Sequence, residues 1–598
     1  MKHLPKRHEV AVNDTWDLSP LFKSDEAWMR AYRKLERQIP LLAGFQGTLG
    51  RSAQCLLACL EFQTRFERAA ERLGEYAGLK AAEDVGNSTY QGLITRYMHL
   101  ATRANEQASY IAPEIQAIPD RRMRSFLKDK SLAPYRFQLE KLLRYKPHIL
   151  SHAEERLLAM QGELIEATPR IFNQLNDADL SFGTCEDDRG KKVPLTQGSF
   201  RSFLESHRRS VRKRAFDQFY AEYDAHKNTL AAALNASVLQ DVYQARVRNF
   251  PTAREAALFA DNVPIAVYDN LIETVHAHLD IVHRYLAIRK KALRLKSLHV
   301  YDTYVPLVRT ASRRTPYEQA ARTVCEALAP LGEEYVRILK EGLLIKRWVD
   351  RYENAGKQSG AFSSGSYDGP PYLLLNYKDD VLDHVFTLAH EAGHSMHSYF
   401  SARNQSFQDY RYSIFVAEVA STFNEQLLNA HLLGKAKDRE TRAYLINREI
   451  DEIRGTLIRQ TMFAEFERNI HAIVESGEPL TLERFRAEYR SLLDAYFGPD
   501  VAIDDALSLE CFRIPHFYSA FYVYKYATGL SAAIALSRTV LQGGETERKR
   551  YLAFLQSGGS RYPLDQLRQA GVDLAKPQPV TDAMEHFKAL VGELETLV

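Results

Sequence analysis

Residues 388–397 read Leu388-Ala389-His390-Glu391-Ala392-Gly393-His394-Ser395-Met396-His397 in this chain of 598 residues. On a helix, His390 and His394 lie one turn apart and project from the same face, so their two imidazoles can bind one metal ion. Glu391 is rotated off that face by one residue and can reach a water molecule on the ion. The stretch therefore predicts a metal-binding helix of the kind that zinc peptidases use.

The same spacing would arise in a helix that carries two solvated or core histidines. The neighbouring sequence argues against this alternative, because residues 385–389 are apolar and no proline interrupts residues 379–400. A helix with apolar residues around its histidines is expected to be buried, and buried imidazoles need polar partners. We therefore interpret His390 and His394 as metal ligands.

A zinc peptidase needs a third protein ligand and leaves one position open for water. Residues 415–425, FVAEVASTFNE, contain no glycine or proline and predict a second helix. Glu418 lies among apolar residues, where an unpaired carboxylate is costly, and Glu425 follows two turns later on the same face. We assign Glu418 as the third ligand and Glu425 as a carboxylate that orients a ligand histidine. A purely structural role for Glu425 is equally compatible with the pattern.

Taken together, these segments resemble the thimet oligopeptidase-like zinc metallopeptidases, and within them the oligoendopeptidase F branch. The resemblance covers nearly the whole chain and is densest between residues 359 and 562. One departure is Ala392, where relatives often carry a larger apolar residue, and we expect it to affect local packing alone. The segments that carry the resemblance, besides the two above, are 16–22 (WDLSPLF), 359–368 (SGAFSSGSYD), 371–376 (PYLLLN), 516–518 (HFY), 521–529 (FYVYKYATG) and 557–563 (SGGSRYP).

The resemblance implies a mainly α, zincin-type metallopeptidase with two helical lobes, a deep substrate channel and a small β element beside the metal helix. It implies one Zn²⁺ per chain at the floor of the channel, and short oligopeptides as substrates. It also implies that a histidine and tyrosines from the segment 516–529 stabilise the reaction's oxyanion. His516 matches the histidine. For the tyrosine we rank Tyr524 and Tyr518 first, followed by Tyr522.

The residues of the segment 516–529 leave an alternative open. We read the segment as one helix on which Tyr518, Tyr522 and Tyr526 recur at fourfold spacing along one face. Such a stripe is more often part of a hydrophobic core than of a catalytic site. Buried tyrosine hydroxyls nevertheless need partners, and peptide hydrolysis develops an oxyanion that needs hydrogen-bond donors.

The stretch 360–377 is rich in glycine and serine before it becomes apolar, and we expect a flexible loop followed by a short strand. An exposed strand edge can hold an extended peptide through main-chain hydrogen bonds. We therefore expect Gly360, Ala361 and Tyr367 to contact the substrate, against the alternative of a surface hairpin. A phosphate-binding loop is disfavoured because no Lys-Ser or Lys-Thr follows the glycines.

Elsewhere the apolar spacing of three and four residues is typical of helices, for example over 27–42, 52–82, 153–175, 199–230 and 441–474. Residues 180–195 predict a β-hairpin around a polar turn. We expect an N-terminal helical lobe over residues 1–198 and a catalytic lobe over residues 199–598.

The composition is typical of a globular protein, with 45% hydrophobic and 26% charged residues. A net charge of +3 gives no reason to expect a nucleic acid or membrane partner. The five cysteines are thinly spread, the opening residues do not resemble a signal peptide, and no apolar run is long enough to span a bilayer. We expect a cytoplasmic protein of undetermined oligomeric state.

The sequence thus predicts a zinc endopeptidase that acts on internal bonds of short oligopeptides, with Glu391 as the general base. Two alternatives remain. A related zinc exopeptidase, of the dipeptidyl carboxypeptidase or carboxypeptidase type, would use the same residues and fix a free terminus of the substrate. A non-catalytic peptide-binding protein would keep the fold alone, which the intact set of His390, Glu391, His394 and Glu418 argues against.

Overall fold

The computed structural model describes residues 4–308 and 314–598. The chain forms two compact units, each built from three separate segments. Unit 1 comprises Met1–Lys146, Ser312–His431 and Leu536–Val572, and unit 2 comprises Pro147–Ala311, Leu432–Ala535 and Asp573–Val598. The boundary predicted after residue 198 lies inside unit 2. Because distant segments combine in each unit, no single position in the sequence separates them.

Unit 1 is helical around one small sheet. Its helices are α1 (Asp25–Glu36), α2 (Ile39–Leu42), α3 (Ala53–Glu83), α4 (Ser88–Ala108), α5 (Ile111–Ala117), α6 (Asp120–Phe126), α7 (Arg136–Arg144), α16 (Tyr317–Ala327), α17 (Glu333–Leu344), α18 (Asp383–Asn404), α19 (Ile414–Lys435), α24 (Glu545–Gln556) and α25 (Pro563–Ala570). The sheet contains β4 (Val349–Asp350), β5 (Phe362–Ser364) and β6 (Tyr372–Leu374). Helix α19 and helix α23 (Tyr524–Gln542) each extend across a boundary between the units.

Unit 2 is also mainly helical. Its helices are α8 (His152–Met160), α9 (Gly162–Ile165), α10 (Ala167–Asn173), α11 (Gln197–Leu204), α12 (Arg209–Val247), α13 (Ala253–Phe259), α14 (Ile265–His276), α15 (Leu279–Ala292), α20 (Arg439–Ile453), α21 (Arg459–Glu475), α22 (Leu482–Phe497) and α26 (Gln578–Leu597). Its strands are β1 (Thr184–Glu186), β2 (Lys192–Pro194), β3 (Leu298–His299) and β7 (Val501–Ala502). The antiparallel pair β1–β2 confirms the predicted hairpin, and β3 pairs with β7 in parallel.

The mainly α fold confirms the helical spacing, with local interruptions. The prediction over 199–230 merges two helices, because α11 ends at Leu204 and α12 begins only at Arg209, after an extended residue at Arg208. The prediction over 441–474 spans α20, a π-helical stretch (Arg454–Ile458) and α21. All five cysteines are free thiols, as their scattered positions predict. Among the described helices, none combines the length and the apolar character that crossing a membrane requires.

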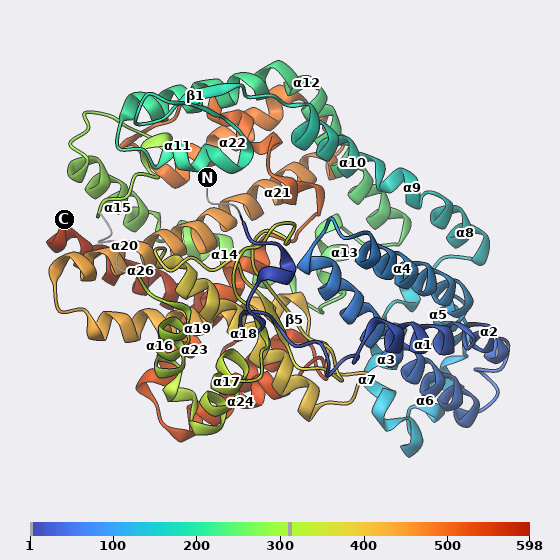
Figure 1. Cartoon of the computed structure of the whole chain (residues 1–598). Helices are drawn as coiled ribbons and strands as arrows, with labels where there is room; N and C mark the ends of the chain where they lie inside the picture. The colour runs from blue at the N-terminus through green and yellow to red at the C-terminus, as the bar shows by residue number, and fades with distance from the viewer. Residues whose placement is uncertain (1–3, 309–313) are drawn as a thin grey trace. The chain divides into compact units, whose positions relative to one another are not determined.

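The core of unit 1 joins α1, α3 and α4, which run side by side (Figure 1). Ser52 begins α3 because its side chain accepts the amide hydrogen of Cys55. Trp28 of α1 is fully buried and donates its indole hydrogen to the carbonyl of Leu73 on α3, at 2.9 Å. The same hydrophobic cluster includes Tyr372 of β6. The sheet is therefore fastened to the helical core.

The sheet has the order β4-β6-β5, so that β5 is an edge strand. Strand β6 is completely buried and pairs in parallel with β4 and antiparallel with β5. Helix α18 packs against β5, where the hydroxyl groups of Ser363 and Ser395 lie 2.7 Å apart. The strand predicted within residues 360–377 is confirmed as β6. Part of the predicted flexible loop forms β5 instead, because pairing with β6 orders it.

Glu75 links α3 to β5 from the other side. The Ser364 hydroxyl donates to Glu75 Oε2 at 3.0 Å, while Glu75 Oε1 is buried and has no hydrogen-bond partner among the described residues. Burial raises the pKa of Glu75 from its ordinary 4.5 to about 7. The ionised form is therefore less stable in the folded protein than in the unfolded chain.

We predict that Glu75→Gln raises the stability of the protein at alkaline pH. Well below pH 4.5 the acid is neutral in both the folded and the unfolded state, so the difference in stability between the variant and the wild type should not change with pH. Between pH 4.5 and about pH 7 the wild type loses up to about 3 kcal/mol of unfolding free energy, a loss that the amide does not share, and above pH 7 the difference levels off. Thermal unfolding at several pH values measures the difference.

A matched control is Glu61→Gln, because Glu61 lies on the same helix and its side chain is half exposed. The melting temperature of this variant should differ from that of the wild type by the same amount at every pH. A Glu75→Gln curve that runs parallel to the wild type from pH 5 to pH 8 would contradict the raised pKa.

Candidate metal centre and its flanking segments

Helices α18 and α19 meet where α18 carries Gly393. A Cβ atom at this position would lie 2.5 Å from the carbonyl oxygen of Ala420 and 2.6 Å from the Cα atom of Ser421, both of α19. Any side chain here would push the helices apart. One turn further along α19, the Asn424 amide donates to the carbonyl of Ala389 at 3.1 Å. The two helices are therefore held backbone to backbone beside the predicted ligands.

This contact brings the three predicted ligands together. Glu418 Oε2 lies 3.4 Å from His390 Nε2 and 3.6 Å from His394 Nε2. One ligand atom from each residue lies within 4.8 Å of the others. The two imidazole rings are nearly perpendicular, at 80°. Two imidazole nitrogens and one carboxylate oxygen that converge in this way fit a divalent metal ion such as zinc and leave a fourth position for another ligand.

Polar neighbours orient two of these ligands. Glu425 Oε1 lies 2.8 Å from His390 Nδ1, as predicted for a carboxylate that orients a ligand histidine. The hydrogen on Nδ1 points to this carboxylate and leaves Nε2 free to bind a cation. Ser421, which the sequence analysis did not single out, donates to Glu418 Oε2 at 2.9 Å.

The charges of the cluster favour a cation. Burial alone lowers the pKa of His390, but the hydrogen bond with Glu425 and the surrounding carboxylates outweigh it and raise this pKa to about 9. Burial acts against the charge of Glu418 as well, yet the hydrogen bond and charge of His394 lower its pKa to about 2. The cluster therefore holds a proton on an imidazole between ionised carboxylates, and a metal ion would displace this proton.

Glu391 is the buried carboxylate next to the ligands. Its side chain is on α18, and the residue is 7% exposed. Burial raises its pKa, although the neighbouring His390 and His394 partly oppose the shift. A carboxylate with a raised pKa beside a metal site is suited to accept and return a proton.

A third histidine of the stretch, His397, does not belong to this cluster. It is completely buried, and its ring stacks on Tyr412 at 3.6 Å between centroids. Neither ring nitrogen has a hydrogen-bond partner among the described residues, and burial lowers its pKa to about 3. The neutral ring therefore packs α18 against the segment that leads into α19.

Glu71 of α3 forms hydrogen bonds with the two loops that flank helix α18. Its Oε2 atom accepts the backbone hydrogen of Tyr367 at 2.9 Å, and its Oε1 atom accepts hydrogen bonds from Arg411 and Tyr410. The Tyr367 hydroxyl donates to the carbonyl of Gln405 at 3.0 Å. Tyr367, predicted to contact substrate, thus also connects the loop after β5 to the segment between α18 and α19. Sequence reasoning missed Glu71, because its partners lie hundreds of positions away.

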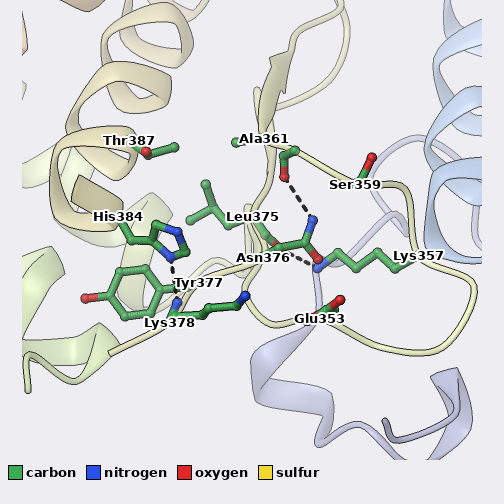
Figure 2. A pocket seen from close by; sticks show the side chains of 11 residues that line it. Glu353, Lys357, Ser359, Ala361, Leu375, Asn376, Tyr377, Lys378, His384 and Thr387 are labelled. Atoms are coloured by element: carbon green, nitrogen blue, oxygen red, sulfur yellow. Dashed lines mark hydrogen bonds between the residues drawn. The ribbon is translucent and has the colours of Figure 1, made fainter. Parts of the chain in front are cut away.

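Gly360 and Ala361 line a cavity of about 420 Å³ beside the metal helix. Figure 2 shows His384 and Thr387 of α18 facing this loop across the cavity. Thr387 precedes the ligand His390 by three residues, so both lie on one side of α18. The loop is held in place by Asn376, whose amide donates to the carbonyl of Gly360 at 2.9 Å.

The predicted helix over residues 516–529 is wrong. A short 3₁₀ helix, η11 (Pro515–Tyr518), is followed by a turn, and α23 begins only at Tyr524. Phe521 within the turn has a φ of 57°, which reverses the chain. The tyrosine stripe is broken for this reason, since Tyr518 and Tyr522 belong to different elements.

The turn gathers His516, Tyr522 and Tyr526 within unit 2. The rings of His516 and Tyr522 are nearly parallel with centroids 6.0 Å apart, and the hydroxyl groups of Tyr522 and Tyr526 lie 3.3 Å apart. These three side chains are partly exposed, whereas Tyr518 and Tyr524 are buried. Tyr526 was not among the predicted site residues, although the fourfold spacing from Tyr522 was a signal for it.

The buried tyrosines have aromatic neighbours. Tyr518 stacks on Phe172 with ring centroids 4.3 Å apart, and Tyr524 lies 5.1 Å from Tyr268. Burial raises the pKa values of both hydroxyl groups above their ordinary range. Burial lowers the pKa of His516, which keeps this imidazole neutral.

Known protein families and a known protein resemble this chain along its length. Residues 202–586 match the family described as Peptidase family M3, and residues 114–182 match the family described as Oligopeptidase F. The chain is 45% identical over 596 residues to the Oligopeptidase PepF of Bacillus subtilis, which covers 100% of this chain and 89% of that protein.

Two solved structures extend the similarity to the fold. A peptidase from Chlamydophila abortus has a TM-score of 0.94 and 35% identity, with full coverage of both chains. The oligoendopeptidase F from Enterococcus faecium has a TM-score of 0.75 and 36% identity, covering 96% of this chain and 99% of that one. These matches span both units of the fold and include α18 and α19. The chain therefore belongs to peptidase family M3.

Proposed function

We propose that this metallopeptidase is a zinc-dependent endopeptidase that hydrolyses internal bonds of short oligopeptides. The observation that carries the proposal is the convergence of His390 Nε2 and His394 Nε2 on one carboxylate oxygen of Glu418. This donor set is typical of catalytic zinc. The relatives, which are named as oligopeptidases, support the substrate class. The five free thiols favour a reducing compartment, and we propose the cytoplasm.

Glu391 is the general base in this proposal. Zinc, when bound, supplies a Lewis acid that polarises the scissile carbonyl and lowers the pKa of the attacking water. Glu391 accepts the proton of this water and then passes it to the departing amine. Its burial supports this role, because a carboxylate whose pKa is raised toward neutrality is both a competent base and a competent acid.

The edge of β5 and the cavity beside it are the proposed substrate contacts. An extended peptide can pair with an edge strand through main-chain hydrogen bonds, which bind it with little regard to its side chains. Gly360 and Ala361 precede β5 and border the cavity, so one substrate side chain would enter it. Ser363 and Ser364 hold this edge against Ser395 of α18 and Glu75 of α3, so the strand is ordered before substrate binds.

We assign oxyanion stabilisation to His516 together with a tyrosine. A neutral imidazole and a phenol are both suitable hydrogen-bond donors. The clustering of His516 with Tyr522 and Tyr526 favours these two tyrosines, whose rings are partly exposed. The burial of Tyr518 and Tyr524 makes them weaker candidates.

We predict that Glu391→Gln binds zinc as the wild type does but loses activity. The amide cannot accept the proton, and general-base catalysis contributes about a hundredfold to ten-thousandfold. The loss should appear in kcat for an internally quenched peptide, with metal content measured on the same samples. Full activity of this variant with one bound zinc would contradict the assignment.

We predict that zinc affinity increases with pH. His390 is protonated below a pKa of about 9 in the free protein, whereas Glu418 stays ionised down to about pH 2. Each zinc must therefore displace at least the proton on His390, and the affinity should rise at least about tenfold per pH unit between pH 6 and pH 8. Competition with a chromophoric chelator measures this slope, and an affinity independent of pH would contradict it.

A further inference from the structure

The turn between η11 and α23 has an unusual conformation. Phe521 adopts a φ of 57°, although its side chain is large and only 3% exposed. The left-handed conformation costs a residue other than glycine about 1–2 kcal/mol, so it persists only where the surroundings enforce it. The next residue is Tyr522, whose ring lies parallel to that of His516. The conformation of Phe521 therefore decides whether these two side chains meet.

Glu467 of α21 provides the enforcing contact. Its Oε1 atom accepts the backbone hydrogen of Phe521 at 3.0 Å. The residue is completely buried, and Oε2 has no hydrogen-bond partner among the described residues. Burial raises the pKa of Glu467 well above its ordinary range, and the nearby Asp241 carboxylate adds to the shift. Burial therefore favours the neutral form of this side chain, and either form can accept the hydrogen bond from the Phe521 backbone through Oε1.

A role in packing alone does not account for a carboxyl group at this position. A polar group without full hydrogen bonding costs about 1–3 kcal/mol when it is buried, and methionine would fill the same volume without this cost. The Phe521 ring is independently held by the rings of His471, at 4.6 Å, and Tyr268, at 5.9 Å. What the carboxyl group adds is an acceptor for one backbone hydrogen in the turn.

We infer that Glu467 is a positioning residue, whose hydrogen bond to the Phe521 amide holds the left-handed turn that places Tyr522 against His516. The inference rests on the proposed function, in which His516 and a neighbouring tyrosine stabilise the oxyanion. Glu467 itself acts through the backbone and does not touch the substrate. Every contact in the argument lies within unit 2.

The test compares Glu467→Gln with Glu467→Met. The amide of glutamine keeps an acceptor for the Phe521 hydrogen, so this variant should retain kcat within about threefold. Methionine fills the same space without an acceptor, and kcat should fall about tenfold to a hundredfold, as expected when a catalytic group is misplaced. KM and zinc content should stay near the wild-type values in both variants, because the proposed ligands and the β5 edge belong to unit 1.

A matched control separates positioning from loss of stability. Glu465 lies two residues earlier on α21, is also buried, and binds His276 and Tyr496 at 2.6 and 3.0 Å. Glu465→Met should lower the melting temperature without a selective loss of kcat. Hydrogen exchange over residues 515–526 provides a readout besides activity, and it should accelerate in Glu467→Met but not in Glu467→Gln or Glu465→Met.

A double-mutant cycle with Tyr522→Phe tests whether Glu467 influences kcat through the placement of Tyr522. If Glu467 acts through the placement of Tyr522, the double variant Glu467→Met/Tyr522→Phe should be about as slow as the slower single variant. Losses that multiply would overturn the inference, as would unchanged hydrogen exchange or equal activity of the Met and Gln variants. If the wild type cleaves no peptide, the proposed function fails instead, and hydrogen exchange still decides whether Glu467 holds the turn.

Discussion

The close approach of α18 and α19 at Gly393 is the constraint on which the metal centre depends. Because this position has no Cβ atom, the backbone of one helix touches the backbone of the other at Ala420 and Ser421. The same contact sets Glu418 opposite the histidine pair and places Ser421 within hydrogen-bonding distance of the Glu418 carboxylate. A separation larger by one methyl group would carry the third ligand away from the first two. The geometry of the proposed ligand set is thus decided by a steric contact between residues outside that set.

Carboxyl groups with little exposure to solvent hold the segments beside the proposed catalytic groups through hydrogen bonds. Glu71 and Glu75 of α3 connect the helical core of unit 1 to the loop after β5 and to β5 itself. Glu467 has the corresponding position in unit 2, where it binds the turn before α23. Each of these groups is costly to bury, and each satisfies backbone or hydroxyl hydrogens of a segment that has little regular structure. The irregular segments near the proposed catalytic groups are therefore ordered by acids from long, well-packed helices.

The convergence of His390, His394 and Glu418 could be predicted from the sequence because its geometry is local. The spacings of four between His390 and His394 and of seven between Glu418 and Glu425 translate directly into faces of two helices. The turn at Phe521 could not be predicted in this way. Its conformation depends on Glu467, which lies 54 positions earlier. The fourfold tyrosine spacing therefore suggested a continuous helix that the chain does not form.

Contacts between distant parts of the chain also explain why the sequence did not predict strand β5 or the division into two units. Strand β5 lies in a glycine- and serine-rich stretch that predicts a loop, and it becomes ordered only through pairing with β6. The two units interleave segments from distant parts of the chain, so a linear pattern of helices does not reveal them.

The most direct test of the central claim is cleavage of an internally quenched, end-blocked oligopeptide, with a zinc chelator and after zinc is restored. We predict internal cleavage that stops on chelation and returns with zinc, whereas cleavage unaffected by the chelator, or no cleavage by the zinc-loaded protein, would contradict the account.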